Sequence, residues 1–258
     1  MCTLLVLHRC FPEAPLVIAA NRDEAHDRPA EGPALRSLRG RMLLAPRDLR
    51  EGGTWLGWND VGMFAALTNR PTRAPDPQRR SRGHLVADVL AETSAKEAME
   101  HLVGLERDLH NPCNVFVADA LAAYTIVLDG EARVRELAPG AHVIGNADPN
   151  DRSHPKVGRL MSELEDVAEG GAEGVTEQLA HVLRMHGPQD DTQSPLEATC
   201  IHAGAYGTRS STMFVRGRTR QEDRLLYANG APCTTDYEDM TPFLGELDRA
   251  AGKTQEIR

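Results

Sequence analysis

The sequence predicts an α+β fold of layered β-sheets covered by helices, in a single domain spanning residues 1–258. Three observations support this prediction. Short strand-like runs occur in blocks separated by turn signals, and two helical blocks with apolar residues three and four apart interrupt them. No internal repeat, linker or low-complexity segment divides the chain. The composition also bears on function: the net charge of -9 argues against broad nucleic-acid binding, which requires a basic face.

The first half of the chain contains five strand-like runs and a pair of helices. Turn signals such as Glu51-Gly52-Gly53 separate the strands. We expect strands over residues 3–8, 16–20, 42–45, 54–58 and 63–68. The apolar spacing within 84–106 predicts two helices, and Thr93 or Ser94 is a suitable N-cap for the second.

The second half contains strands, then two helices, then strands again. We expect strands over residues 114–118, 124–128, 132–137 and 142–145, with Asp129-Gly130 forming a hairpin between the second and third. Helices are predicted over 155–168 and 175–185. Strands are then predicted over 198–202, 212–216 and 225–229.

Composition indicates a cytoplasmic protein without a metal site or a required cofactor. No apolar run approaches the roughly 18 residues of a membrane helix, and residues 3–7 are too short for a signal-peptide core. The five cysteines are irregularly spaced and form no Cys-x-x-Cys pair, which indicates neither a zinc ribbon nor a disulfide framework. Most of them should be reduced and buried. The sequence does not define an oligomeric state.

Cys2 is the cysteine whose position suggests chemistry. Methionine is removed readily before a small residue, which would leave a thiol and a free α-amine on the same residue. That amine has an ordinary pKa of about 7.7–8.0, so it can accept the thiol proton near neutral pH. The alternative is that Cys2 is a small apolar residue buried at the start of an edge strand.

The run over residues 16–20 leads directly into Asn21, Arg22, Asp23 and Glu24. If this strand pairs antiparallel with the first, Asp23 lies within reach of the Cys2 amine and can orient it. Arg22 would pair with an acidic ligand or with Glu24. The alternative is a surface turn with local ion pairs, each contributing about 0–1 kcal/mol.

Further polar residues follow strand-like runs elsewhere. Asn69 and Asn146 are candidate donors to a developing oxyanion, although turn or cap positions are the alternative for each. Arg209 lies in a polar cluster behind glycines, and a solvated loop is its alternative. In "GGTWLGWN" the phosphate-loop ending is absent, so we expect a tight turn that places Trp55 and Trp58 against the core or a pocket wall.

Five motifs in order, "NRDE", "GGTWLG", "AALTNRP", "SRGHLV" and "YGTRSST", resemble the NRDE-motif family, known as the transport and Golgi organisation protein 2 family. The resemblance extends from Met1 to about Met213. It implies an N-terminal nucleophile hydrolase-like αββα sandwich of two antiparallel sheets with outer helices. The pattern is more distantly similar to choloylglycine hydrolases and penicillin V acylases, which cleave amides with an N-terminal cysteine.

By this resemblance Cys2 matches the nucleophile, and Asp23 matches the aspartate that contacts its amine. Asn69 matches an oxyanion-hole asparagine, while Asn146 and Arg209 match further polar residues of the pocket. The ligand-binding candidates are Asn21, Arg22, Glu24, Trp55 and Trp58. One departure is that the hydrolases carry an arginine three residues before the aspartate, where this chain has Ala20. Arg22 is adjacent to Asp23 and, on a strand, faces the opposite way.

The resemblance implies a C–N hydrolase or acyltransferase acting on a small acyl substrate. Members of the family have also been linked to mobilising haem between compartments. A haem-trafficking chaperone without turnover, with haem as cargo, is therefore the alternative. The chain has neither a Cys-x-x-Cys-His attachment motif nor a Cys-Pro pair.

Overall fold

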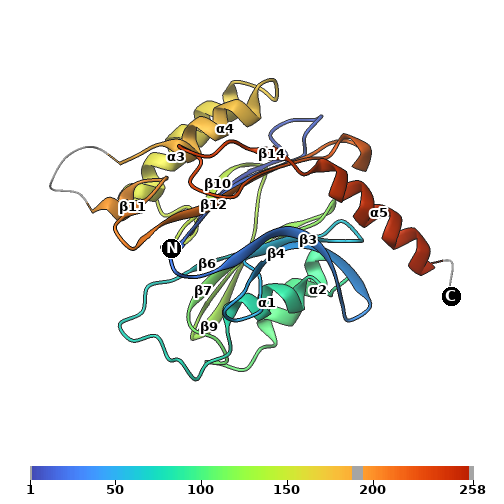
Figure 1. The fold of residues 1–258 in the computed structure, drawn as a ribbon, viewed down its shortest axis with the longest axis horizontal. Coiled ribbons are helices and arrows are strands. Elements are labelled where there is room, and N and C mark those ends of the chain that lie inside the picture. Colours follow the sequence, from blue (N-terminus) through green and yellow to red (C-terminus); the bar gives the residue numbers. More distant parts are fainter. Residues whose placement is uncertain (1, 188–193, 256–258) are drawn as a thin grey trace. The chain divides into compact units, whose positions relative to one another are not determined.

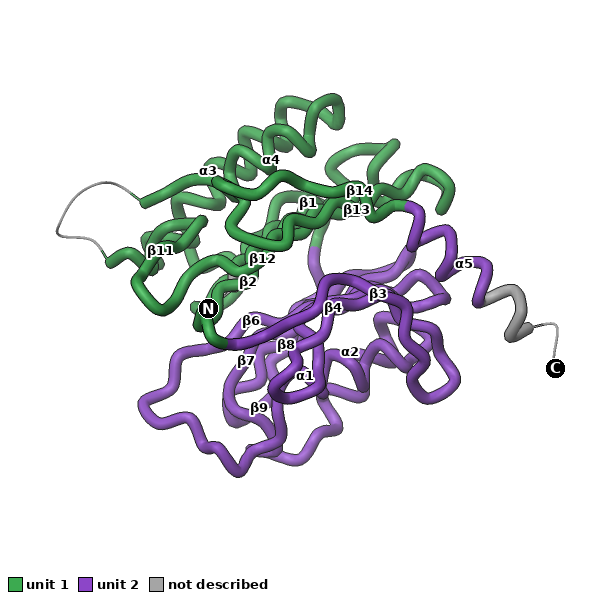
Figure 2. The backbone as a smooth tube through the Cα atoms, in the orientation of Figure 1, with its two compact units in different colours: residues 1–27, 138–241 green, residues 28–137, 242–258 purple. Residues whose placement is uncertain are grey.

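The computed structural model describes residues 2–187 and 194–255. The chain divides into two compact units, each built around one antiparallel sheet (Figures 1 and 2). Unit 1 contains residues 1–27 and 138–241, and unit 2 contains residues 28–137 and 242–258. None of the helices in the described ranges is long and apolar enough to cross a membrane.

The sheet of unit 1 has seven strands in the order β10-β1-β2-β12-β13-β14, with β11 paired to β12. The strands are β1 (Cys2–His8), β2 (Leu16–Ala25), β10 (Gly140–Ile144), β11 (His202–Ala203), β12 (Tyr206–Arg216), β13 (Arg224–Ala228) and β14 (Glu238–Asp239). The strand predicted over 198–202 is wrong except at His202. The amides of Thr199 and Cys200 both donate to the carbonyl of Met185, and this holds the segment in an irregular conformation.

Two helices, α3 (Pro155–Glu169) and α4 (Val175–Arg184), cover one face of this sheet (Figure 1). Their apolar stripes pack on alternate residues of β1 and β2, such as Leu5, Leu7 and Val17. Pro155 occupies the first turn of α3, where its missing N–H breaks no helical hydrogen bond. Both helices are at the predicted places. Unit 1 also contains the short 3-10 helices η1 (Pro195–Glu197) and η2 (Arg220–Glu222).

The sheet of unit 2 is a meander of seven strands in chain order, β3 to β9. The strands are β3 (Ala30–Leu38), β4 (Arg41–Asp48), β5 (Leu56–Asn59), β6 (Phe64–Asn69), β7 (Cys113–Ala118), β8 (Ala123–Asp129) and β9 (Glu131–Glu136). Helices α1 (Arg82–Val89) and α2 (Ala95–Val103) pack on one of its faces. The final helix is α5 (Thr241–Gln255), which the sequence pattern did not indicate.

Local signals explain several boundaries of unit 2. Ser94 is the N-cap of α2, because its side chain accepts a hydrogen bond from the amide of Glu97. The Glu97 carboxylate in turn accepts one from the amide of Thr93. The predicted hairpin joins β8 to β9, with Gly130 at a φ of 79° that few other residues adopt. Both predictions are confirmed.

Candidate functional site

The first two strands bring Cys2 to the end of the NRDE segment. β1 and β2 pair antiparallel, with Cys2 opposite Arg22 and Thr3 opposite Asn21. This confirms the predicted pairing of the two strands. The backbone of Cys2 therefore lies beside the NRDE segment.

The NRDE residues belong to strand β2, which extends to Ala25 and not only to Ala20. Asn21, Arg22 and Asp23 are 1%, 5% and 1% exposed, so the alternative of a surface turn is wrong. The extension arises because β12 continues alongside β2 as far as the pair between Tyr206 and Ala25. Strand alternation places Asn21 and Asp23 on the helix-covered face and Arg22 and Glu24 on the other.

The Asn21 side chain links strand β2 to two other segments of unit 1. Its amide nitrogen donates to the carbonyls of Leu183 and Thr199, at 2.9 Å each. The Leu183 carbonyl is in the last turn of α4, where no helical amide is available to it. These two bonds give the side chain a structural role, holding the end of α4 and the segment before Cys200 against β2.

Asp23 is a carboxylate buried within the sheet and helix layer of unit 1. Burial raises its pKa from 3.8 to about 6, while the charge of Lys156 and a hydrogen bond from Thr208 oppose that rise. The Thr208 hydroxyl donates to Oδ1 of Asp23 at 2.7 Å and accepts from the amide of Ile201. Asp23 is therefore ionised at neutral pH but changes protonation in the mildly acidic range.

Lys156 and Thr208 are the two members of this group that the sequence did not identify. Lys156 lies in the first turn of α3 and is 6% exposed, although lysine is seldom buried without a partner. One signal was present, since Lys156 is four residues before the core residue Leu160 and so shares its helix face. Thr208 carried no local signal.

Asn146 lies just after β10 and borders a small cavity of unit 1. The cavity has a volume of about 20 Å³, room for about one water molecule, and Thr3 and Lys156 also line it. Asn146 is 9% exposed. Among the predicted site residues, Asn146 therefore lies beside Lys156, the residue whose charge acts on Asp23.

Arg209 is the extra residue of a β-bulge, since the register of β12 against β2 shifts between Thr208 and Ser210. Its Nη1 lies 3.4 Å from Nδ1 of His26. Burial raises the pKa of Tyr227, and the charges of Arg22 and Arg209 oppose that rise. The charges of Arg22 and Arg209 therefore both act on the pKa of Tyr227.

The remaining predicted residues lie in unit 2. Asn69 is the last residue of β6, opposite Cys113, and is half-buried. Trp58 is 1% exposed in β5, with its ring centroid 5.2 Å from that of Phe64. Trp55 just precedes β5 and is 9% exposed. Both tryptophans are buried, as one of the predicted placements requires, and their part in ligand binding stays a prediction.

A separate group in unit 1 has the donor atoms to bind a metal ion. It consists of His186, Cys200, His202 and Cys233. The irregular spacing of these residues concealed the group, and the short Cys200-x-His202 pair was its one signal in the sequence.

Solved structures define the class of fold. A conjugated bile acid hydrolase from Clostridium perfringens, a mutant with Cys changed to Ala at its position 2, matches 96% of this chain and 94% of its own, with a TM-score of 0.56 and 12% identity. A Caenorhabditis elegans ortholog of N-acylethanolamine-hydrolyzing acid amidase matches 83% and 92%, with a TM-score of 0.53 and 14% identity. The chain therefore has the expected N-terminal nucleophile hydrolase-like fold of two antiparallel sheets with helices.

The chain belongs to the transport and Golgi organisation 2 family, whose model matches residues 1–223. A Bos taurus transport and Golgi organization protein 2 homolog is 31% identical over 226 residues, which are 78% of this chain and 81% of the relative. The Homo sapiens homolog is 36% identical over 141 residues, 51% of this chain and 50% of the relative. The resemblance carried by the five motifs is confirmed.

Proposed function

We propose that this chain is an N-terminal-cysteine amide hydrolase or acyltransferase acting on a small acyl substrate. The observation that carries the proposal is the β1–β2 ladder, which sets Cys2 opposite Arg22 and one residue from the buried Asp23. The likeness to two hydrolases supports it at the level of fold, and one of these was solved as a mutant in which a Cys at position 2 is replaced by Ala.

The reaction begins once Met1 is removed and the Cys2 α-amine is free. The thiol adds to the carbonyl carbon of the amide, and its proton passes to the α-amine. Collapse of the tetrahedral adduct breaks the C–N bond, and that proton leaves with the amine product. The thioester is then cleaved by water, or the acyl group passes to a second nucleophile.

The charged groups of unit 1 take complementary roles in this proposal. Asp23 holds the Cys2 ammonium in place, because a buried carboxylate is a strong partner for a nearby cation. Arg22 and Arg209, whose charges both act on the pKa of Tyr227, bind an oxygen of the acyl ligand. Asn146 is the candidate oxyanion donor within unit 1. The same role for Asn69 of unit 2 stays a prediction.

Intact mass spectrometry of the full chain, produced without an N-terminal tag, is the first test. We expect the mass of the chain without Met1. Iodoacetamide at limiting dose near neutral pH should label Cys2 first, because burial raises the pKa of Cys10, and that of Cys113 to about 12. A p-nitrophenyl acyl ester should form a thioester adduct that is lost in Cys2→Ala and kept in Cys10→Ala.

Two outcomes would overturn the proposal. Retention of Met1 would block the α-amine and remove the base. Met1 removal with a Cys2 no more reactive than Cys10 would leave a binding protein, for which a haem titration is the next measurement. If turnover is found, Asp23→Asn should lower it by at least about 100-fold, the scale of positioned acid–base groups.

A further inference from the structure

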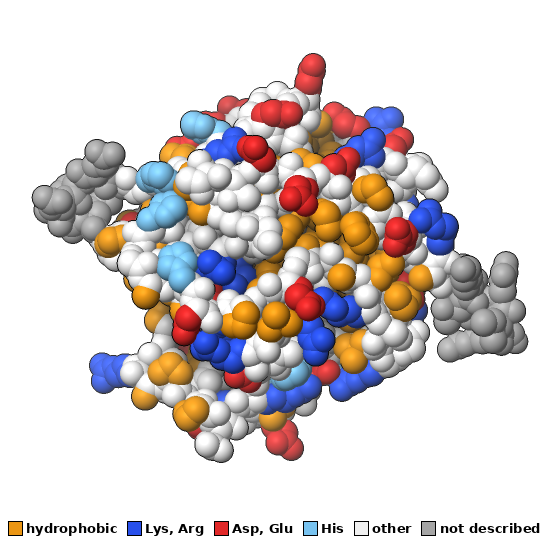
Figure 3. Space-filling view, in the orientation of Figure 1, with side chains coloured by type: hydrophobic (Ala, Val, Ile, Leu, Met, Phe, Trp, Pro, Cys, Tyr) orange, Lys and Arg blue, Asp and Glu red, His pale blue; other side chains and the backbone are white. Residues whose placement is uncertain are grey.

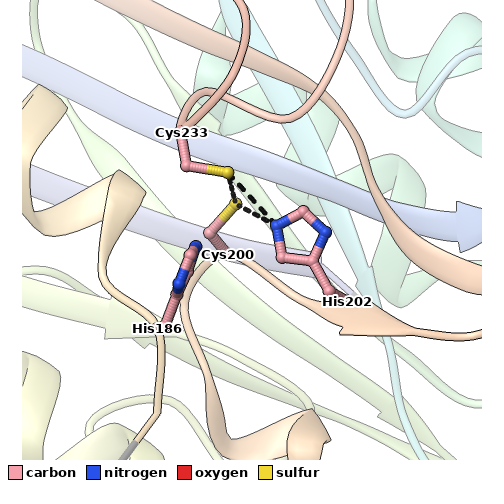
Figure 4. A group of neighbouring side chains, drawn as sticks. All are labelled: His186, Cys200, His202 and Cys233. Atoms are coloured by element: carbon pink, nitrogen blue, oxygen red, sulfur yellow. Dashed lines mark hydrogen bonds between the residues drawn. The ribbon is translucent and has the colours of Figure 1, made fainter.

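Two cysteines and two histidines from three separate segments meet in unit 1 (Figure 4). His186 follows helix α4, Cys200 lies two residues before β11, His202 is the first residue of β11, and Cys233 lies in the turn after β13. Cys200 is buried, Cys233 is half-buried and both histidines are exposed. In the space-filling view, histidine side chains gather on the part of unit 1 where β11 lies (Figure 3).

The distances between these side chains match the edges of a tetrahedron around a metal ion. With metal–sulfur bonds of about 2.3 Å and metal–nitrogen bonds of about 2.0–2.1 Å, tetrahedral geometry separates two sulfurs by about 3.8 Å and sulfur from nitrogen by about 3.6 Å. The Cys200 and Cys233 sulfurs are 3.4 Å apart. Nε2 of His202 lies 3.7 Å from the first and 3.2 Å from the second.

His186 completes the set. Its ring stands edge-on to that of His202, with centroids 5.2 Å apart, and all four ligand atoms lie within 4.8 Å of one another. Figure 4 shows its ring beside Cys200, on the side away from Cys233. One ion placed among the four atoms would therefore contact each of them after small side-chain rotations.

Hydrogen bonds to main-chain carbonyls hold the three segments in this arrangement. The carbonyl of Met185 accepts from the amides of Thr199 and Cys200, which fixes the position of His186 relative to Cys200. Nε of Arg184 donates to the carbonyl of Pro232, which joins the end of α4 to the turn that carries Cys233. The ligand segments are thus supported by hydrogen bonds outside the ligand set, as is usual around a bound metal ion.

We propose that His186, Cys200, His202 and Cys233 bind a zinc ion. Two sulfur and two imidazole ligands suit zinc and exclude magnesium and calcium, which prefer oxygen. Four protein ligands leave no open position, so the zinc is structural and not a catalytic Lewis acid. Binding converts both thiols to thiolates and releases two protons for each zinc ion bound.

The same four residues do not suit haem iron. A porphyrin occupies the four in-plane positions of its iron, and the protein supplies axial ligands only. Four ligand atoms within 4.8 Å of one another leave no space for a macrocycle between them. A disulfide between Cys200 and Cys233 is the competing outcome, and metal analysis under reducing conditions separates it from the metal site.

The zinc site is connected to the proposed active site through one threonine. The amide of Ile201, between the two ligands Cys200 and His202, donates to the hydroxyl of Thr208. That hydroxyl donates to Asp23 at 2.7 Å. Zinc would therefore keep the donor of Asp23 in place, although zinc binding itself is independent of whether the chain is an enzyme.

The test begins with metal analysis of the full chain purified without chelator under reducing conditions. We expect about one zinc per chain, and X-ray absorption should give two sulfur and two nitrogen neighbours at about 2.3 Å and 2.0 Å. Cobalt replacement should produce the intense visible bands of a tetrahedral ion with thiolate charge transfer. These measurements use the unaltered chain and do not depend on the folding of a variant.

Variants then assign the ligands. His202→Ala should weaken zinc binding by at least about 100-fold in a competition titration, and Cys233→Ser should weaken the cobalt charge-transfer bands, because only the Cys200 thiolate remains. Cys10→Ser and His26→Ala, outside the cluster, should bind as the parent does. Absence of stoichiometric zinc after incubation with zinc, an oxygen-rich coordination shell, unchanged affinity in His202→Ala, or a Cys200–Cys233 disulfide under reducing conditions would each overturn the proposal.

Discussion

Asp23 makes the stability of the folded chain depend on pH in a defined direction. Burial raises its pKa from 3.8 to about 6, so the folded chain binds this proton more tightly than the unfolded chain. The stabilisation is complete below about pH 4 and is lost as the pH rises through about 6. The loss corresponds to about 3 kcal/mol of unfolding free energy.

This sign can be checked with Asp23→Asn, which removes the titration. Urea unfolding at several pH values should show the variant gaining on the parent chain by about 3 kcal/mol between about pH 4 and pH 7. Asp166→Asn, at an exposed position of α3, is the control, and its unfolding free energy should show the same pH dependence as that of the parent chain. A difference between Asp23→Asn and the parent that does not change with pH would contradict the raised pKa.

The same experiment on Lys156→Met isolates the effect of the Lys156 charge on the pKa of Asp23. The Lys156 charge favours the ionised carboxylate of Asp23. Its loss should therefore move the upper end of the pH range in which Asp23 loses its proton and the chain loses stability to above pH 6. Lys96→Met removes an exposed lysine, 70% accessible at its side chain, and should leave this pH range unchanged. An unchanged pH range in Lys156→Met would show that the Lys156 charge does not contribute to the pKa of Asp23.

At this scale the sequence identified the residues with local signals and missed those that depend on the fold. Cys2 and the NRDE segment were predicted as neighbours, because antiparallel pairing of two consecutive strands is a local event. Lys156 reaches Asp23 from a helix more than a hundred residues away, and Thr208 from another strand. No spacing in the sequence reports such contacts.

At the scale of elements, the "GGTWLG" motif is explained by a close approach of backbones. A Cβ built on Gly53 would lie 2.3 Å from the carbonyl carbon of Gly83, in the first turn of α1. The amide of Thr54 donates to the carbonyl of the same Gly83 at 3.0 Å. The turn before β5 therefore touches helix α1 directly, and only glycine fits there.

Gly53→Ala should consequently lower the unfolding free energy by about 1–3 kcal/mol, because backbone atoms must move to admit the methyl group. The measurement is the midpoint of urea unfolding. Gly104→Ala is the matched control, since its nearest neighbour would be 3.5 Å away and its φ of -78° suits alanine. Equal midpoints for Gly53→Ala and the parent would show that this contact is loose enough to admit a methyl group.

The errors in predicting elements also have physical causes. β3 was missed because Gly32 and Pro33 interrupt its alternation, and the structure accommodates them with a shift of register between Glu31 and Ala34. Residues 198–202 are apolar enough to be predicted as a strand, yet the amides of Thr199 and Cys200 donate to the carbonyl of Met185. Most other strands were predicted within a few residues, and so were the four helices α1, α2, α3 and α4.

At the scale of the whole molecule, the proposed zinc site predicts where the chain loosens when the metal is lost. All four ligands belong to unit 1, in segments that hydrogen bonds join to the end of α4 and to β12. The sheet of unit 2 is built from consecutive strands, so each neighbour is supplied by residues nearby in the chain. The two units therefore differ in their dependence on contacts made by distant segments.

Hydrogen exchange of the zinc-loaded chain, with and without a zinc chelator, tests this difference. Protection should fall by at least about tenfold in residues 198–208 and 231–235, and should be unchanged in β5 (Leu56–Asn59), β6 (Phe64–Asn69) and β7 (Cys113–Ala118). Cys200→Ser without chelator should reproduce the pattern, and the chelator should add nothing to it. Equal loss across both units would mean that zinc supports global stability, whereas no loss at residues 198–208 would mean that the hydrogen bonds of Met185, Arg184 and Thr208 hold these segments without an ion.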